Sequence, residues 1–268
     1  MKEITVTNQM LATMGNTALL LFILPLVFLF VWKRKKGSEA ALKPFFIGMI
    51  GFFVCARILE LGVHMFCIIA DNPVSRFING HTAAYVIYGV LMAGIFEEVG
   101  KYFILKYLMK NNRTRENMVM YGIGHGGIEV WVISFAQILT YLAIGASISL
   151  YGTKEGLEAM GMPAGAEASV ALLLDTIAGF TFSYGLMVVL ERISCMFIHI
   201  SLTIFVFRAV EKSEKKYLFF AVLAHMVLDL VPALSQRITI PIAFTEGYLV
   251  VCAVVLTYFA RKLYLKRD

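Results

Sequence analysis

Ionisable side chains occur in the middle of four hydrophobic stretches, each long enough to cross a lipid bilayer. In chain order they are Glu97, Glu98 and Lys101; His125 and Glu129; Glu191, Arg192 and His199; and His225 and Asp229. A charged side chain at bilayer depth costs about 2.5–3.5 kcal/mol on insertion scales, so such residues usually face a bundle interior and mark function. The sequence therefore predicts one polar site inside the membrane.

The spacing of these residues places them on defined helix faces and at one depth. The pairs that lie four residues apart, and so share a face, are Glu97/Lys101, His125/Glu129 and His225/Asp229. His199 and the other three clusters lie about 8–13 residues from the basic ends of their stretches, and a bilayer core takes about 20 residues. We therefore expect all of them near the membrane midplane. Glu98 points about 100° away from Glu97, towards a neighbouring helix.

These residue types suit the hydrolysis of a peptide bond, which needs a base for water, an oxyanion stabiliser and an acid for the leaving amine. We expect Glu97 to be the base that activates water. The predicted catalytic residues are Glu97, Glu98, Glu129, His199, His225 and Asp229. The candidate metal ligands are His199, His225 and Glu129, a His/carboxylate set of the kind that zinc uses catalytically. A metal-free mechanism, in which glutamate and histidine activate water, stays open.

Four further residues are predicted to support this site: Lys101, His125, Glu191 and Arg192. Glycines surround His125, which lets its helix pack closely or bend. Lys101 could simply neutralise one glutamate. Glu191 and Arg192 could equally form a structural ion pair. A lone intramembrane histidine such as His64 more often serves packing than catalysis.

The composition identifies the class of protein. Of 268 residues, 59% are hydrophobic and only 16% are charged, whereas soluble domains have about 25% charged residues. The mean hydropathy is +0.77. No polar stretch is long enough to build a soluble core, so we predict a single integral membrane domain over residues 1–268. The polar site would be built from residues 83–109, 117–150, 185–210 and 217–234.

Basic residues predict the orientation in the membrane. They cluster after the first hydrophobic stretch, after the third and near residues 208–216, and the chain ends in RKLYLKRD. The positive-inside rule then predicts a multi-pass protein of the cell membrane with its N-terminus outside and its C-terminus in the cytoplasm. The net charge of +6 is explained by this orientation, so we expect no nucleic-acid partner. The expected partners are the lipid bilayer and a membrane peptide or protein substrate.

Residues 167–210 hold enough apolar residues for two crossings, but two crossings would invert the orientation of everything after them. We therefore expect one spanning helix at 185–210 and a short re-entrant or interfacial helix at 168–184. The predicted fold class is all-α, a polytopic membrane bundle of about seven transmembrane helices plus that short helix.

The ordered motifs resemble those of a known family. They are Glu97-Glu98-x-x-Lys101, Gly124-His125-Gly126-Gly127-x-Glu129, Glu191-Arg192 with His199, and His225-x-x-x-Asp229. This set resembles the YhfC family, which is grouped with the PrsW and CAAX-protease families of intramembrane metalloproteases. The resemblance implies a membrane-embedded peptidase in which a glutamate and a histidine activate water. Asp229 stands where the CAAX-protease branch often has asparagine, so its expected role is to orient His225 or to bind metal.

Other classes of function use similar residues. A proton- or ion-coupled carrier also places glutamate, histidine and aspartate at the midplane, although no internal repeat is evident. A haem-binding cytochrome could use His199 with His225 but leaves the buried carboxylates unexplained. A non-enzymatic immunity or scaffold protein would tolerate loss of these residues.

Overall fold

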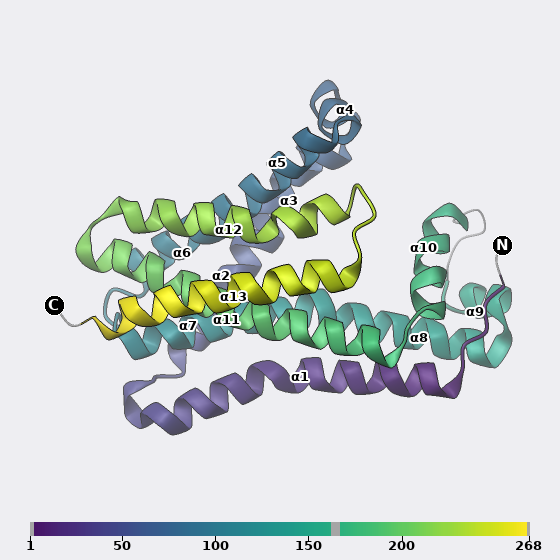
Figure 1. Cartoon of the computed structure of the whole chain (residues 1–268), viewed down its shortest axis with the longest axis horizontal. Helices are drawn as coiled ribbons and strands as arrows, with labels where there is room; N and C mark the ends of the chain where they lie inside the picture. The colour runs from purple at the N-terminus through teal and green to yellow at the C-terminus, as the bar shows by residue number, and fades with distance from the viewer. Residues whose placement is uncertain (1–2, 162–166, 267–268) are drawn as a thin grey trace. The chain divides into compact units, whose positions relative to one another are not determined.

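The computed structural model describes residues 3–161 and 167–266, and within these ranges the chain is all-α (Figure 1). Seven of its helical stretches are long and apolar enough to cross a membrane. They are Asn8–Glu39, Lys43–Ile69, Thr82–Leu108, Arg115–Tyr151, Phe182–Lys212, Lys215–Ser235 and Ile242–Leu265. The predicted fold class, a polytopic helical membrane protein with about seven spans, is confirmed.

Three of the spans alternate between α-helical and π-helical segments. The second consists of α2 (Lys43–Phe52), η2 (Phe53–Glu60), α3 (Leu61–His64) and η3 (Met65–Ile69). The third consists of α5 (Thr82–Gly94), η4 (Ile95–Val99), α6 (Gly100–Phe103) and η5 (Ile104–Leu108). The fourth consists of α7 (Arg115–Glu129), η6 (Val130–Phe135) and α8 (Ala136–Tyr151).

The other spans are single α-helices. They are α1 (Asn8–Lys36), which ends in the 3₁₀ turn η1 (Gly37–Glu39), and α11 (Phe182–Lys212), α12 (Lys215–Ser235) and α13 (Ile242–Leu265). Three shorter helices lie between spans: α4 (Pro73–Gly80), α9 (Thr153–Ala159) and α10 (Glu167–Ala178).

The ambiguous stretch 167–210 contains one helix of spanning length. α11 is a single helix of 31 residues, whereas α10 has 12 residues, and a bilayer core takes about 20. The structure thus agrees with one crossing here. Whether α10 lies in the interface or re-enters the membrane stays a prediction.

The chain divides into two compact units. One comprises Met1–Leu24 and Val130–Arg192, and the other comprises Pro25–Glu129 and Ile193–Asp268. Whether the two behave as a single domain stays a prediction. In the first unit, Gly145 of α8 faces Leu11 of α1 and Ile177 of α10, and the Ile4 N–H donates to the Thr153 hydroxyl at 3.0 Å.

The second unit contains the close helix contacts that position the polar residues. A Cβ added at Gly124 of α7 would lie 1.9 Å from the Phe45 carbonyl oxygen of α2, and one at Gly48 would lie 2.2 Å from the Tyr121 carbonyl oxygen. The α2 and α7 backbones therefore touch through glycines, as small residues allow in membrane helices. Elsewhere in this unit, Val86 and Val90 of α5 pack with Ala233 of α12.

Candidate functional site

Three buried side chains from three spans meet in the second unit. Glu97, in the π-helical segment η4, lies with its Oε2 2.9 Å from His125 Nε2 of α7. The same oxygen lies 3.7 Å from His199 Nδ1 of α11. The rings of His125 and His199 are 4.9 Å apart between centroids. All three residues are buried, so the structure brings together one carboxylate and two imidazoles away from solvent.

A second group adjoins the first through the neighbouring glutamate. Glu98 Oε1 accepts from Lys101 Nζ at 2.6 Å and lies 2.7 Å from His225 Nδ1 of α12. The other nitrogen of His225 lies 3.3 Å from Asp229 Oδ2. Adjacent glutamates of η4 thus contact different helices, as expected from their angular separation on a helix. Glu98 and Lys101 are completely buried, whereas the Asp229 side chain is 37% exposed.

Lys101 connects the two groups. Its Nζ lies 3.2 Å from His199 Nδ1 and 3.8 Å from Glu97 Oε2, in addition to its bond with Glu98. An ammonium group can only donate, so His199 Nδ1 accepts and its Nε2 carries the hydrogen. That Nε2 contacts Glu129 Oε2. Glu129 therefore fixes the tautomer of His199, which is the usual part of a second carboxylate behind a functional histidine.

The glycines around His125 explain how these side chains come together. A Cβ at Gly122 would lie 2.7 Å from Ile200 Cα of α11, and one at Gly126 would lie 3.3 Å from His199 Cβ. α7 therefore approaches α11 closely on one face, and it touches α2 through Gly124 on another. Because side chains larger than glycine would separate these helices, the glycine-rich sequence is what allows His125 to reach Glu97 and His199.

The π-helical segment that carries both glutamates was not predicted. No sequence signal separates residues 95–99 from the α-helix before them. Single π-turns often occur at functional sites in membrane and soluble helices. Cys195 is a second unpredicted neighbour: its Sγ donates to Glu129 Oε1 at 3.3 Å. Its only sequence signal is that it lies one helical turn before His199.

Two of the predicted supporting residues lie in the first compact unit. Glu191 and Arg192 contact each other and fall in the first unit, whereas the residues above fall in the second. The contact agrees with the structural ion pair that the sequence left open. Their supporting role at the site stays a prediction.

Three combinations of side chains could hold a metal ion among the described residues. They are Glu97, His125 and His199; Glu129, Cys195 and His199; and Glu97, Glu98 and His225. The combination expected from the sequence, His199 with His225 and Glu129, is not among them. The reason is geometric: Glu129 contacts the Nε2 side of His199, whereas His225 is turned towards Glu98 and Asp229.

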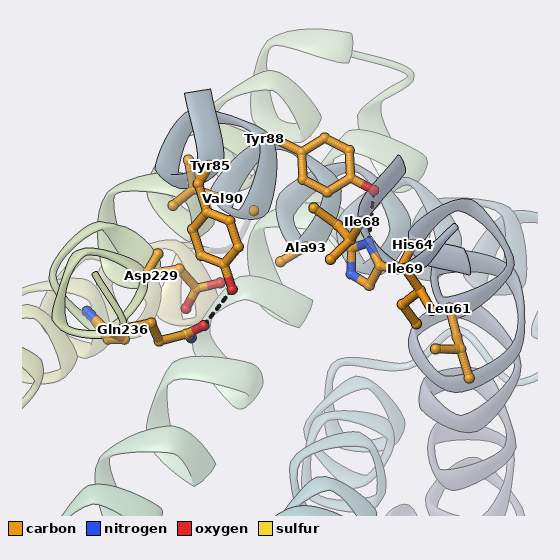
Figure 2. Close-up of a pocket in the computed structure, with 13 residues that line it drawn as sticks. Leu61, His64, Ile68, Ile69, Tyr85, Tyr88, Val90, Ala93, Asp229 and Gln236 are labelled. Atoms are coloured by element: carbon orange, nitrogen blue, oxygen red, sulfur yellow. Dashed lines mark hydrogen bonds between the residues drawn. The ribbon is translucent and has the colours of Figure 1, made fainter. Parts of the chain in front are cut away.

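A cavity of about 420 Å³ adjoins the cluster at Asp229 and is lined by α5, α12 and the second span (Figure 2). A larger cavity of about 740 Å³ lies elsewhere in the second unit, against α1, α7, α11 and α13. None of the predicted site residues lines that larger cavity.

The sequence profile of the family described as YhfC intramembrane metalloprotease matches residues 20–250. A protein of Bacillus subtilis (strain 168), described as uncharacterized membrane protein YhfC, is 33% identical over 234 residues, which is 87% of each chain. No solved structure matches. With a family match over most of its length and a relative of this similarity, the chain belongs to the YhfC family of multi-pass membrane proteins.

Proposed function

We propose that this chain is an intramembrane endopeptidase that hydrolyses a peptide bond at the cluster of Glu97, Glu98, His125, His199 and His225. The observation that carries the proposal is the burial of these ionisable side chains in mutual contact at spanning-helix depth. Such an arrangement is expensive in a membrane and is typical of functional sites. The family's description as an intramembrane metalloprotease supports the same reaction class.

The donor set fits a divalent metal ion. Glu97, His125 and His199 supply one carboxylate and two imidazoles, which is a ligand set of catalytic zinc sites. His125 Nδ1 and Glu98 Oε2 are buried with no hydrogen-bond partner among the described residues, so both atoms are available to bind a ligand or water. When bound, such an ion would supply a Lewis acid that polarises the scissile carbonyl. We propose zinc as the metal.

We assign the role of the base to Glu98, whereas the sequence predicted Glu97. If Glu97 is a ligand, then Glu98 is the carboxylate available to act on water. Lys101 and His225 hold it through Oε1, which leaves Oε2 free. In the proposed reaction Glu98 takes the proton of the attacking water and delivers it to the leaving nitrogen as the C–N bond breaks. Asp229 positions His225, and Glu129 positions His199.

The remaining features of the proposal concern location and partners. We place the chain in the cell membrane with its N-terminus outside and its C-terminus in the cytoplasm, on the distribution of basic residues. The substrate would be a membrane peptide or a membrane protein, because the cluster lies within spanning helices and can be reached only by a chain that enters them.

The test combines metal analysis with identification of cleavage products. Detergent-purified protein should contain about one zinc per chain, and Glu97→Gln should lose the metal whereas Glu98→Gln should keep it. Cells that produce the unsubstituted protein should contain new N-termini of membrane proteins, and these N-termini should be absent from cells that produce Glu98→Gln. General base catalysis supplies about 10²–10⁴ in rate, so this variant should leave almost no product.

Two outcomes would count against the proposal. Normal product formation by a Glu98→Gln variant that accumulates to the parent level would remove the assigned base. The carrier function would be favoured if no new N-termini depended on this protein and if vesicles containing it showed a proton or ion flux that Glu98→Gln abolishes.

A further inference from the structure

The cavity that reaches Asp229 lies at one particular end of the spanning helices. Tyr85 is in the first turn of α5, and Gln236 directly follows the last residue of α12. The basic clusters lie at the opposite ends of the same spans, after η5 and before α12. By the positive-inside rule, the cavity therefore belongs to the outer half of the membrane.

The cavity has polar groups on two sides (Figure 2). On one side Tyr85 donates to Gln236 at 2.8 Å, close to Asp229 in this view. On the other side His64 Nδ1 and the Tyr88 hydroxyl are 2.8 Å apart. Its volume of about 420 Å³ falls in the range of about 300–1,000 Å³ that is usual for ligand sites. The hydroxyl, imidazole, amide and carboxylate groups interrupt a lining that is otherwise largely apolar, so a polar segment would find hydrogen-bonding partners at these positions.

The cavity wall is continuous with the proposed catalytic cluster. Asp229 lines the cavity and lies 3.3 Å from His225, which contacts Glu98 at 2.7 Å. Ala93, another lining residue, precedes Glu97 by one helical turn on the third span. A polar chain in this cavity is therefore separated from the buried glutamates by one histidine.

The charge of the lining favours cations. Among the described residues, Asp229 is the one Asp, Glu, Lys or Arg residue that lines the cavity. Glu60 stands behind the lining at 3.3 Å from His64 Nε2. Arg237 follows the lining residue Gln236, lies over the Tyr85 ring and contacts the Asn79 carbonyl oxygen. Clefts lined by one sign of charge concentrate ions of the opposite sign.

We propose that this cavity is the substrate vestibule of the proposed peptidase, open to the outer side and selective for a peptide segment that carries a positive charge. The substrate's cationic side chain or free amine would pair with Asp229, which places the bound segment one histidine, His225, away from Glu98. The role as a substrate vestibule rests on the proposed function. Whether the cavity is water-filled and selective for cations can be tested without measuring peptide hydrolysis.

Two glycines provide a matched pair of cysteine positions. Gly89 lines the cavity, and Gly62 does not; an added Cβ at either one would meet no atom within 4 Å. Each lies about seven residues from the same end of its span, so their depths match. Gly89→Cys and Gly62→Cys are made in the full-length chain in membranes and treated from outside with cationic MTSET or anionic MTSES. Mass spectrometry of the peptides that contain residues 89 and 62 gives the rate at which each reagent modifies each cysteine.

We expect MTSET to modify Gly89→Cys at least about tenfold faster than MTSES, because thiolates react only where water and reagent reach them and the lining attracts cations. Adding Asp229→Asn should remove this preference, and Arg237→Gln should increase it. Gly62→Cys should react with neither reagent. Failure of Gly89→Cys to react from outside, equal reactivity of the two glycine positions, or a preference unchanged by Asp229→Asn would overturn the vestibule. Labelling as expected with no cleavage products would leave the vestibule standing and refute the peptidase.

Discussion

Lys101 is the residue on which the polar cluster most depends for charge balance. It is completely buried, and its Nζ reaches Glu98 at 2.6 Å, His199 at 3.2 Å and Glu97 at 3.8 Å. Removing one partner of a buried ion pair leaves an uncompensated charge, which costs far more than the pair itself contributes to stability. Lys101 therefore neutralises a buried glutamate and contacts the other residues of the cluster through the same ammonium group.

We predict that Lys101→Met lowers the free energy of unfolding by about 3–5 kcal/mol, because it leaves the buried Glu98 carboxylate without the ammonium group that balances its charge. The measurement is thermal unfolding in detergent without added metal. Glu98→Gln combined with Lys101→Met should recover much of the loss, since contacting residues show coupling energies of about 0.5–3 kcal/mol. Lys106→Met, at an exposed lysine of the same span, is the control. Strictly additive effects of the two substitutions would contradict the pairing.

The sequence predicted which residues belong to the cluster better than it predicted their partners. The four-residue spacing of Glu97/Lys101 and of His225/Asp229 corresponds to real contacts of 3.8 Å and 3.3 Å. The metal set was not predictable in the same way. Whether His199 faces Glu97 or His225 depends on the rotation of α11 relative to its neighbours, and periodicity within one helix contains no information on that rotation.

At the scale of elements, glycines determine how closely the spans approach. The sequence indicated that the glycines around His125 permit close packing, but not which helix each of them contacts. Gly124 faces α2, whereas Gly122 and Gly126 face α11. The sequence did not reveal the π-helical segment that carries Glu97 either, because nothing in residues 95–99 distinguishes a π-helical turn from an α-helical one.

We predict that Gly124→Ala is strongly destabilising, because its Cβ would lie 1.9 Å from the Phe45 carbonyl oxygen and neither backbone can yield without separating α2 from α7. His125 would move with α7, so zinc binding should fall as well. Gly62→Ala is the matched control: its Cβ meets open space, and alanine in a helix is favoured over glycine by about 0.5–1 kcal/mol. Unfolding temperatures and metal content of the two variants decide the matter. Equal stability would contradict the close contact.

At the scale of the whole molecule, hydropathy and charge predicted the architecture because they report on the membrane itself. Every spanning helix must satisfy its backbone internally and bury an apolar surface in lipid, so the spans are visible in composition. What composition could not predict is the division into two compact units, since it depends on which helices pack together. All proposed catalytic and metal-binding residues fall in one of them, the unit of Pro25–Glu129 and Ile193–Asp268.

The last prediction concerns the orientation on which the vestibule depends. Seven crossings place the connection after α1 and the connection between α11 and α12 on one side, and the connection after α8 on the other. Cysteines at Ser38 and Glu214 should be protected from an impermeant reagent applied outside intact cells, and a cysteine at Lys154 should react. Ser38 and Lys154 have exposed side chains, and none of the three has positive φ, unlike Gly37 and Ser213. Labelling of Glu214→Cys from outside would mean that residues 167–210 cross twice, which would place His225 and the cavity at Asp229 in the opposite orientation.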